Sequence, residues 1–399
     1  MKTLPMLCAV VVGSLFLSAC QREQPVVEGA EASAARAPET RSLSVPISQP
    51  WAVAVRPGDG ESPAVMAAIS HQDNYLKLFE FDGRQPREVF STPTGYHPDF
   101  VRWLDFDGDG RRDELLVIVE GEPLVKLGRY HQGEFSWQGQ FPMTDEPPRE
   151  AAVGDLDGDG HQDIVLSPYW GGEVFILWNK GEFDFELEAL NGGFLVSFPS
   201  LADLDGDGRL DVVWSNREGG AVVVAYNRGE RQFDIESVVY PPLGASTSTR
   251  RVHLGDLNGD GKPDLIAAFE NTPQVWILYN VDGDFEVQRE ELPVPATPGY
   301  SEAVFDPATG LLALSEPNGV WLGRREGEDQ TWVFRRLLDR VWMLDLQFQD
   351  IDNDGEQDLT MARTMGEEVK IVYGPLWEYA TPVEAPSPEQ GGDAERAGS

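Results

Sequence analysis

Short apolar segments separated by turns recur along the chain from about residue 51 to residue 380. One unit reads EAAVGDL, DIVLSP, EVFILWNK and FDFELEAL, four runs rich in Val, Ile, Phe and Leu. The next unit repeats the pattern with SLADL, DVVWS, AVVVAYN and FDIESVV, and the following one with VHLGDL, DLIAAF, QVWILYN and FEVQREEL. Gly, Asn or Asp lies between the runs. The pattern predicts four short β-strands per unit and an all-β protein.

An acidic segment separates the first two runs in five of these units. It reads DLDGDGHQDIVL at residues 155–166, and near-copies lie at residues 105–117, 203–214, 256–267 and 350–361. The copies recur about every fifty residues, with a double gap before the last, which is the mark of a repeat architecture. Residues 301–317, with Asp306, fill that gap, and residues 51–70, with Asp59, have the same strand–turn–strand outline. The chain therefore contains seven units.

Four strands in a repeat of about fifty residues predict a blade of a β-propeller. The alternative is a row of β-sandwich domains, but a repeat of about fifty residues is too short for one sandwich of about 100 residues. We therefore predict a seven-bladed propeller of four-stranded blades, in one domain over residues 46–380. Its five acidic segments would be the loops between the first two strands of their blades.

The charge balance is strongly acidic. The 399 residues contain 68 Asp and Glu against 31 Lys and Arg, a net charge of −37. Such a charge argues against nucleic acid or anionic lipid headgroups as partners. The acids outside the repeated segments are interpreted as a solvated surface.

The N-terminus has the pattern of an export signal. MKTLPMLCAVVVGSLFLSAC combines a basic start with a short apolar run, which is too short to span a bilayer. The ending LSAC resembles the lipobox of bacterial lipoproteins, so residues 1–20 are predicted to be a lipoprotein signal with Cys20 as the lipidated residue. Gln21 follows, and the absence of Asp there favours the outer membrane. The alternative is an ordinary signal peptide cut near Ala19.

Cysteine usage agrees with export and lipidation. The two cysteines are Cys8, in the signal, and Cys20. The exported domain then has no disulfide available, although its compartment is oxidising. Residues 21–45, rich in Ala, Glu, Pro and Ser, are predicted to be a flexible tether, and residues 381–399 a disordered tail.

The acidic loops have the chemistry of a cation site. At an effective dielectric of about 20, two carboxylates roughly 4 Å apart repel by about 4 kcal/mol, so crowded aspartates require a counter-charge. Asp at positions 1, 3 and 5 with Gly at 6 resembles the start of an EF-hand loop. These loops have Asp at position 9 instead of Glu at 12, and strands flank them. A set of oxygen ligands favours Ca²⁺ over Zn²⁺ and Mg²⁺.

The repeats resemble FG-GAP (VCBS-type) repeats, as in the propeller of integrin α-subunits, over about residues 51–378. Dockerin modules share the acidic loop but have shorter helical repeats. The resemblance implies a propeller that binds about five Ca²⁺ ions and none in the first and sixth units. It assigns as calcium ligands the residues at positions 1, 3, 5 and 9 of each loop: Asp105, Asp107, Asp109, Asp113, Asp155, Asp157, Asp159, Asp163, Asp203, Asp205, Asp207, Asp211, Asp256, Asn258, Asp260, Asp264, Asp350, Asp352, Asp354 and Asp358.

We expect calcium to stiffen the blades and a partner to bind on the other face. In a propeller, loops between first and second strands lie on one face, whereas second-to-third and blade-to-blade loops lie on the other. Exposed aromatic residues in the latter loops are typical of a surface that binds a protein or a glycan. The candidates are Tyr96, Tyr169, Trp170, Phe194, Tyr240, Tyr300 and Trp342. The alternative is that single aromatic residues pack between blades.

Evidence for catalysis is weak. Five histidines are scattered, and HExxH, GxSxG and P-loop motifs are missing. We therefore favour a monomeric, membrane-anchored binding or scaffold module in a bacterium, on the periplasmic or the surface side. Two alternatives remain. One is a carbohydrate-active enzyme or lectin, because some polysaccharide lyases and lectins have similar repeats, and the other is an outer-membrane assembly factor.

Overall fold

The computed structural model describes most of the predicted propeller. The described residues are 41–60, 62–143, 146–168, 170–181, 183–193, 195–217, 221–237, 249–269, 274–294 and 302–382. The expected signal peptide with Cys20 and nearly all of the expected tether and tail lie outside these residues.

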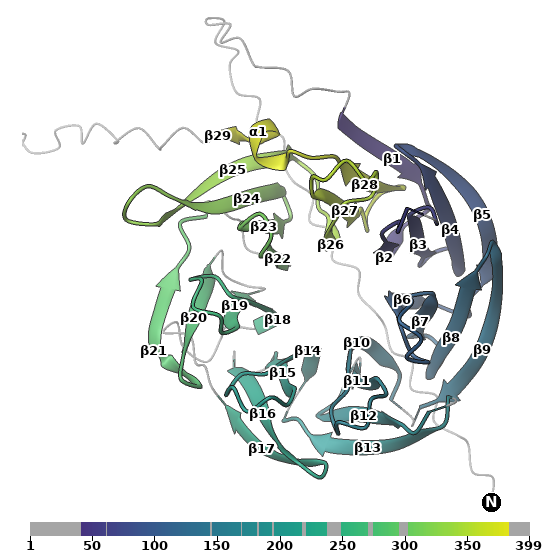
Figure 1. The fold of residues 1–399 in the computed structure, drawn as a ribbon, viewed down its shortest axis with the longest axis horizontal. Helices are drawn as coiled ribbons and strands as arrows, with labels where there is room; N and C mark the ends of the chain where they lie inside the picture. The colour runs from purple at the N-terminus through teal and green to yellow at the C-terminus, as the bar shows by residue number, and fades with distance from the viewer. Residues whose placement is uncertain are drawn as a thin grey trace, which may run out of the picture. The chain divides into compact units, whose positions relative to one another are not determined.

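Seven antiparallel sheets form the blades of a ring, with the first strand of each blade nearest the centre (Figure 1). The predicted seven-bladed propeller is thereby confirmed. The first blade contains β2 (Pro50–Arg56), β3 (Val65–Ser70), β4 (Tyr75–Asp82) and β5 (Gln85–Pro93). The second contains β6 (Pro98–Leu104), β7 (Glu114–Val119), β8 (Leu124–His131) and β9 (Glu134–Pro142). The third contains β10 (Pro148–Gly154), β11 (Asp163–Pro168), β12 (Glu173–Asn179) and β13 (Phe185–Asn191).

The other four blades repeat this order. The fourth contains β14 (Val196–Ala202), β15 (Asp211–Asn216), β16 (Ala221–Gly229) and β17 (Gln232–Ser237). The fifth contains β18 (Thr249–Gly255), β19 (Asp264–Phe269), β20 (Val275–Val281) and β21 (Asp284–Glu291). The sixth contains β22 (Glu302–Asp306), β23 (Leu311–Glu316), β24 (Gly319–Glu326) and β25 (Thr331–Asp339). The seventh contains β26 (Leu344–Gln349), β27 (Asp358–Ala362), β28 (Glu368–Val372) and β1 (Ser42–Pro46).

The ring is closed by a strand from the N-terminal end of the domain. β1 pairs antiparallel with β28, with Ser42 opposite Val372 and Pro46 opposite Glu368, so the seventh blade joins both ends of the chain. This strand corrects the expected tether of residues 21–45, because residues 42–45 belong to the domain. As an outer strand, β1 buries Val45 and exposes most of its neighbours, which leaves only a weak pattern in the sequence.

The C-terminal end of the domain also differs slightly from expectation. After β28, the helix α1 (Leu376–Tyr379) buries Leu376 and Trp377. β29 (Thr381–Pro382) then pairs with β25 as a fifth strand of the sixth sheet. The expected tail of residues 381–399 therefore begins two residues too early.

The hydrophobic core consists of separate clusters, and each cluster lies between two adjacent blades. One joins Leu115 and Val117 of the second blade to Ala67 and Leu76 of the first. Another joins the first and seventh blades, so the series of interfaces runs around the whole ring. All six residues of β11 are buried, as in a second strand that is covered on both faces. The propeller is therefore stabilised by packing between blades.

The antiparallel order assigns the loops to two faces. We call the side of the first-to-second strand loops at residues 105–113, 155–162, 203–210, 256–263 and 350–357 the acidic face. The second-to-third strand loops and the blade-to-blade loops lie on the other side, and we call it the opposite face. Its described loops include residues 71–74, 94–97, 120–123, 340–343 and 363–367.

Candidate functional site

The acidic loops wrap around their own carboxylates. In the third blade, Asp155 Oδ1 accepts the Gly158 N–H at 2.7 Å and Asp155 Oδ2 accepts the Gly160 N–H at 2.9 Å. Asp159 Oδ1 accepts the N–H of His161 at 2.8 Å. Both glycines have positive φ values, 77° and 91°, which side chains with a Cβ rarely adopt. The DGDG sequence therefore turns the chain back on itself.

The acid at position 9 anchors the end of the loop to the sheet. Asp163 begins β11 and is fully buried. Its Oδ2 accepts the Leu156 N–H at 2.9 Å, and its Oδ1 accepts the N–H of Asn179, on the third strand, at 2.8 Å. The same pair of hydrogen bonds is made at three further loops, by Asp211, Asp264 and Asp358.

Four of the five loops bring three carboxylates together. In each, one oxygen from every carboxylate lies within 4.8 Å of the others. The clusters are Asp155, Asp157 and Asp163; Asp203, Asp205 and Asp211; Asp350, Asp352 and Asp358; and Asp105, Asp107 and Glu114. Positions 1 and 3 thus converge with the acid that begins the second strand, whereas Asp109, Asp159, Asp207 and Asp354 at position 5 lie outside these clusters.

The loop of the second blade uses a different acid. Glu114 takes the place that the spacing assigned to Asp113: its Oε2 accepts the Phe106 N–H at 3.0 Å, and it is fully buried. The register explains the change, because β7 begins at Glu114, one residue later than the equivalent strands. Asp113 instead contacts His131 Nδ1 at 2.7 Å. A sequence signal existed, since the clustering acid directly precedes the apolar run in every loop.

Burial disfavours the charge on these anchoring acids. It raises the pKa of Asp163 to about 6, although the hydrogen bonds from the backbone of Asn179 and Leu156 lower this pKa. It likewise raises the pKa of Asp358 to about 7 and that of Glu114 to about 7. The pKa values of Asp211 and Asp264 are raised for the same reason. A cation beside the carboxylates would offset this cost and keep them ionised.

Arginines already supply some positive charge at position 3. Asp157 Oδ2 lies 2.9 Å from Arg231 of the next blade, and Asp352 Oδ2 lies 2.5 Å from Arg84 of the first blade. In their own blades, Arg228 contacts Asp205 and Arg129 contacts Asp107. Each contact uses one oxygen of its carboxylate.

The remaining oxygens fit a hard cation. Asp105 Oδ1 and Asp157 Oδ1 are buried and find no hydrogen-bond partner. Clustered carboxylate oxygens without competing nitrogen or sulfur donors are the ligand set that Ca²⁺ prefers. The clusters can therefore hold divalent cations, with the arginines reducing the repulsion that remains without metal.

The fifth blade and the two weaker units differ from this set. In the fifth blade Asn258 Oδ1 accepts the Asp260 N–H at 2.9 Å. This loop therefore has the same turn as the others but contains one carboxylate fewer. In the sixth blade Asp306 Oδ2 accepts the Thr309 N–H at 3.0 Å. In the first, Asp59 Oδ1 accepts the Ser62 N–H at 2.6 Å. The last two aspartates thus act within ordinary turns.

The third strand of the next blade supports three of the acidic loops. Asn227 Nδ2 of the fourth blade donates to the Leu156 carbonyl in the loop of the third blade at 2.7 Å. Asn280 Nδ2 repeats this contact to Leu204 at 2.8 Å, and Arg325 Nε contacts the Leu257 carbonyl at 3.2 Å. Each of these loops is therefore held by a neighbouring blade as well as by its own.

The exchanged acid of the second blade gives a matched pair of variants. We expect Glu114→Gln to remove one bound Ca²⁺ ion, because it removes a clustered charge, and Asp113→Asn to leave the ion count unchanged. Native mass spectrometry of both variants measures the difference. Loss of an ion from Asp113→Asn alone would show that the spacing, and not the register, selects the ligand.

The predicted partner residues are only partly described. Tyr96 and Trp170 are 56% and 60% exposed on the opposite face, whereas Trp342 is partly buried. Tyr96 stacks on His97, with ring centroids 4.0 Å apart. Four candidates, Tyr169, Phe194, Tyr240 and Tyr300, lie outside the described residues. Sequence analysis missed two other exposed side chains on this face, Tyr75 and Met365.

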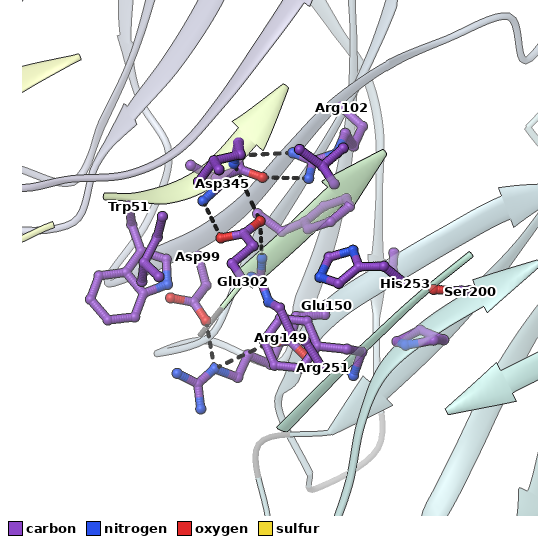
Figure 2. A pocket seen from close by; sticks show the side chains of 18 of the residues that line it. Trp51, Asp99, Arg102, Arg149, Glu150, Ser200, Arg251, His253, Glu302 and Asp345 are labelled. Atoms are coloured by element: carbon purple, nitrogen blue, oxygen red, sulfur yellow. Dashed lines mark hydrogen bonds and ion pairs between the residues drawn. The ribbon is translucent and has the colours of Figure 1, made fainter. Parts of the chain in front are cut away.

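A network of charged residues lines the central channel (Figure 2). Asp345 of the seventh blade accepts two hydrogen bonds from Arg102 of the second, at 2.5 and 3.0 Å. It also accepts the Val53 N–H of the first blade at 2.7 Å. Glu302 of the sixth blade accepts the Asp345 N–H at 2.6 Å and pairs with Arg251 of the fifth.

The network continues through the third and fourth blades. Arg149 Nε lies 3.0 Å from Asp99 of the second blade, and Glu150 accepts the Phe198 N–H of the fourth at 2.9 Å. Burial and, next, the charge of Asp99 raise the pKa of Glu120 to about 8, which favours its protonated form. The sequence pattern did not single out these residues, because each looks like an ordinary charge near the end of a strand.

Comparisons with known proteins agree with the repeat architecture. The family model described as FG-GAP-like repeat matches residues 105–166, 155–214 and 203–267. Each match begins at one acidic loop, includes the acidic loop of the following blade and ends in the second strand of that blade. No curated protein matches the chain. Within the described residues, none of the helices has the length and apolar character that a membrane crossing requires.

Solved structures show the same fold. Sqt1 of Saccharomyces cerevisiae is 11% identical, with a TM-score of 0.58, over 84% of this chain and 98% of that one. Because 702 solved chains match, the likeness identifies a widely shared architecture and not an activity. The sequence and the structure together show that the chain is a seven-bladed β-propeller that contains FG-GAP-like repeats over residues 105–267.

Proposed function

We propose that this chain is a calcium-stabilised binding module that presents its opposite face to a partner. The observation that carries the proposal is the separation of two features. Carboxylate clusters occupy the acidic face, whereas the exposed Tyr96, Trp170 and Met365 lie in loops of the opposite face and the exposed Tyr75 begins β4 there. Large exposed apolar side chains beside polar loops are the composition of a binding surface. Calcium would then stabilise the propeller, and the opposite face would bind the partner.

The test compares two pairs of exposed apolar residues. The full protein in mild detergent captures its partner from the source cells, and the double variant Tyr96→Ala/Trp170→Ala is expected to lose it. Val287 and Ile235, which are 64% and 44% exposed on the outer strands β21 and β17, provide the matched control. Partner loss from Val287→Ala/Ile235→Ala, with retention by the first variant, would place recognition on the rim of the propeller.

We further propose that lipid on Cys20 holds the module at a bacterial membrane, with the outer membrane favoured by Gln21. The lipobox ending at Cys20 and the polar segment after it support this anchor. We expect Cys20→Ala to move the protein from the membrane fraction to the soluble fraction, because alanine lacks the thiol to which the lipid would be attached. Fractionation followed by immunoblotting measures the change. Continued sedimentation of Cys20→Ala with membranes would contradict the anchor.

A further inference from the structure

The central channel contains a cavity of about 230 Å³. First strands of all seven blades line it, and most of the lining residues lie in the first half of their strand (Figure 2). Those halves follow the blade-to-blade loops, so the cavity lies at the end of the channel that belongs to the opposite face. It is therefore remote from the carboxylate clusters and close to the proposed partner surface.

Irregular backbone directs side chains into this cavity. The register of the first strand shifts at Asp99, at Arg149, at Phe198 and at Asp345. Phe198 and Asp345 both have a φ of 52°, which is uncommon outside glycine. Bulges of this kind re-aim side chains and recur beside functional sites.

The charges that line the cavity nearly cancel. Three arginines on the wall each pair with a carboxylate: Arg102, Arg149 and Arg251. Four acids lie on the wall: Asp99, Glu150, Glu302 and Asp345. Burial raises the pKa of Glu302, while the charge of Arg251 opposes this shift. A ligand with a full charge would disturb these pairs, whereas a neutral polar ligand would not.

The wall offers both donors and acceptors. Burial and then the charges of Arg251 and Arg102 lower the pKa of His253 to about 3, so its imidazole is neutral. Its Nε2 atom is buried without a hydrogen-bond partner, and Asp99 Oδ1, which also makes no hydrogen bond, lies 3.6 Å from His71 Nδ1. A hydroxyl group donates and accepts at once, so it can satisfy an imidazole nitrogen and a carboxylate oxygen alike.

Aromatic surface completes the lining. Trp51 and Phe198 both contribute to the wall, and Trp51 lies against His71 with ring centroids 4.9 Å apart. Apolar walls with a few placed polar groups are typical of small-molecule sites, and this cavity is below the usual range of about 300–1,000 Å³ for drug-sized ligands. The net charge of −37 also opposes an anionic polymer. A small, neutral ligand that is rich in hydroxyl groups would therefore fit this cavity.

We propose that the channel cavity binds one unit of a neutral sugar, at the end of a glycan chain that reaches the protein from the opposite face. This inference rests on the proposed function, since it names a ligand class for the same face. Asp99 and His253 would hold hydroxyl groups, and Trp51 would cover the apolar face of the ring.

Saturation-transfer NMR on the calcium-loaded full protein in mild detergent tests the proposal. The probes are glucose, galactose, mannose and N-acetylglucosamine, each up to about 10 mM, a range that detects a Kd near 1 mM. At least one is expected to bind and to be displaced by itself at higher concentration. Asp99→Asn is expected to weaken this binding about tenfold or more, as is Ala151→Leu, which fills the cavity without removing an ion pair. Asp234→Asn, on the outer strand β17, should bind like the wild type.

Three results would overturn the proposal. They are no saturable binding of any of the four sugars, binding that both cavity variants retain, and preferential binding of acetate or n-butylamine as charged probes. Thermal melting of each variant separates lost binding from lost folding. If no sugar binds while Tyr96→Ala/Trp170→Ala still loses the partner, the proposed function stands and the sugar site does not. If sugar binding fails and that variant also keeps its partner, both are wrong.

Discussion

Chelation of calcium with EGTA is expected to lower the melting temperature of the propeller by on the order of 20 °C. A metal that binds only the native loop stabilises it by about 2.7 kcal/mol at a hundredfold excess over Kd, so five loops together reach on the order of 10 kcal/mol. In a domain of about 150–250 residues each kcal/mol changes the melting temperature by about 2–4 °C, and a larger domain changes less. Differential scanning calorimetry with and without EGTA measures the shift.

The clusters explain both the size of the effect and its limit. Without metal, Asp155, Asp157 and Asp163 repel one another across less than 4.8 Å, and Asp163 is fully buried. Arg231 offsets part of this repulsion, so the metal-free protein is expected to fold with reduced stability. The loss should be greatest at low salt, where charges are least screened. A melting curve that EGTA leaves unchanged would show that the arginines alone stabilise the loops.

Asp345→Asn is expected to destabilise the propeller by about 3 kcal/mol, although it lies far from the acidic loops. Removing one partner of a buried ion pair costs about 3–5 kcal/mol, and we expect the lower end because Arg102 borders the cavity. Asp345 is 3% exposed and accepts hydrogen bonds from both Arg102 and Val53. Asparagine tolerates the positive φ of this position, so the change tests charge and not backbone strain. Urea unfolding measures the difference.

An exposed ion pair provides the control for this variant. Asp234 pairs with Arg228 at 2.8 Å, but its side chain is 67% exposed, so Asp234→Asn should change stability by less than about 0.5 kcal/mol. Adding Arg102→Met to Asp345→Asn should restore part of the lost stability, because no unpaired guanidinium remains. Equal stability of Asp345→Asn and Asp234→Asn would mean that the channel network does not hold the ring together.

Local sequence predicted the blades because each blade is formed by consecutive strands. The acidic loop, the buried second strand and the turns recur within about fifty residues, a period that can be read directly from the chain. Ring closure could not be predicted in the same way. The strand β1 has only two large apolar residues, Leu43 and Val45, and it pairs with β28, which lies at the other end of the domain in the sequence.

The site was predicted where it depends on spacing and missed where it depends on register or on distant contacts. Asp155, Asp157 and Asp163 lie together as the repeat implied. Glu114 replaced Asp113 because the strand begins one residue later, which spacing alone does not show. The pairing of Arg102 with Asp345 joins residues 243 positions apart across the channel, so neither residue has a local signal.

The most direct test of the account is a count of tightly held calcium ions by native mass spectrometry of the purified protein. The account predicts five ions, one in each acidic loop of the second, third, fourth, fifth and seventh blades, and a reduction to four in Asp157→Ala/Asp159→Ala. That variant should also melt at a lower temperature and still bind its partner on the opposite face. Fewer than three tightly held ions in the wild type, or a normally folded variant that has lost its partner, would contradict the assignment of calcium to one face and recognition to the other.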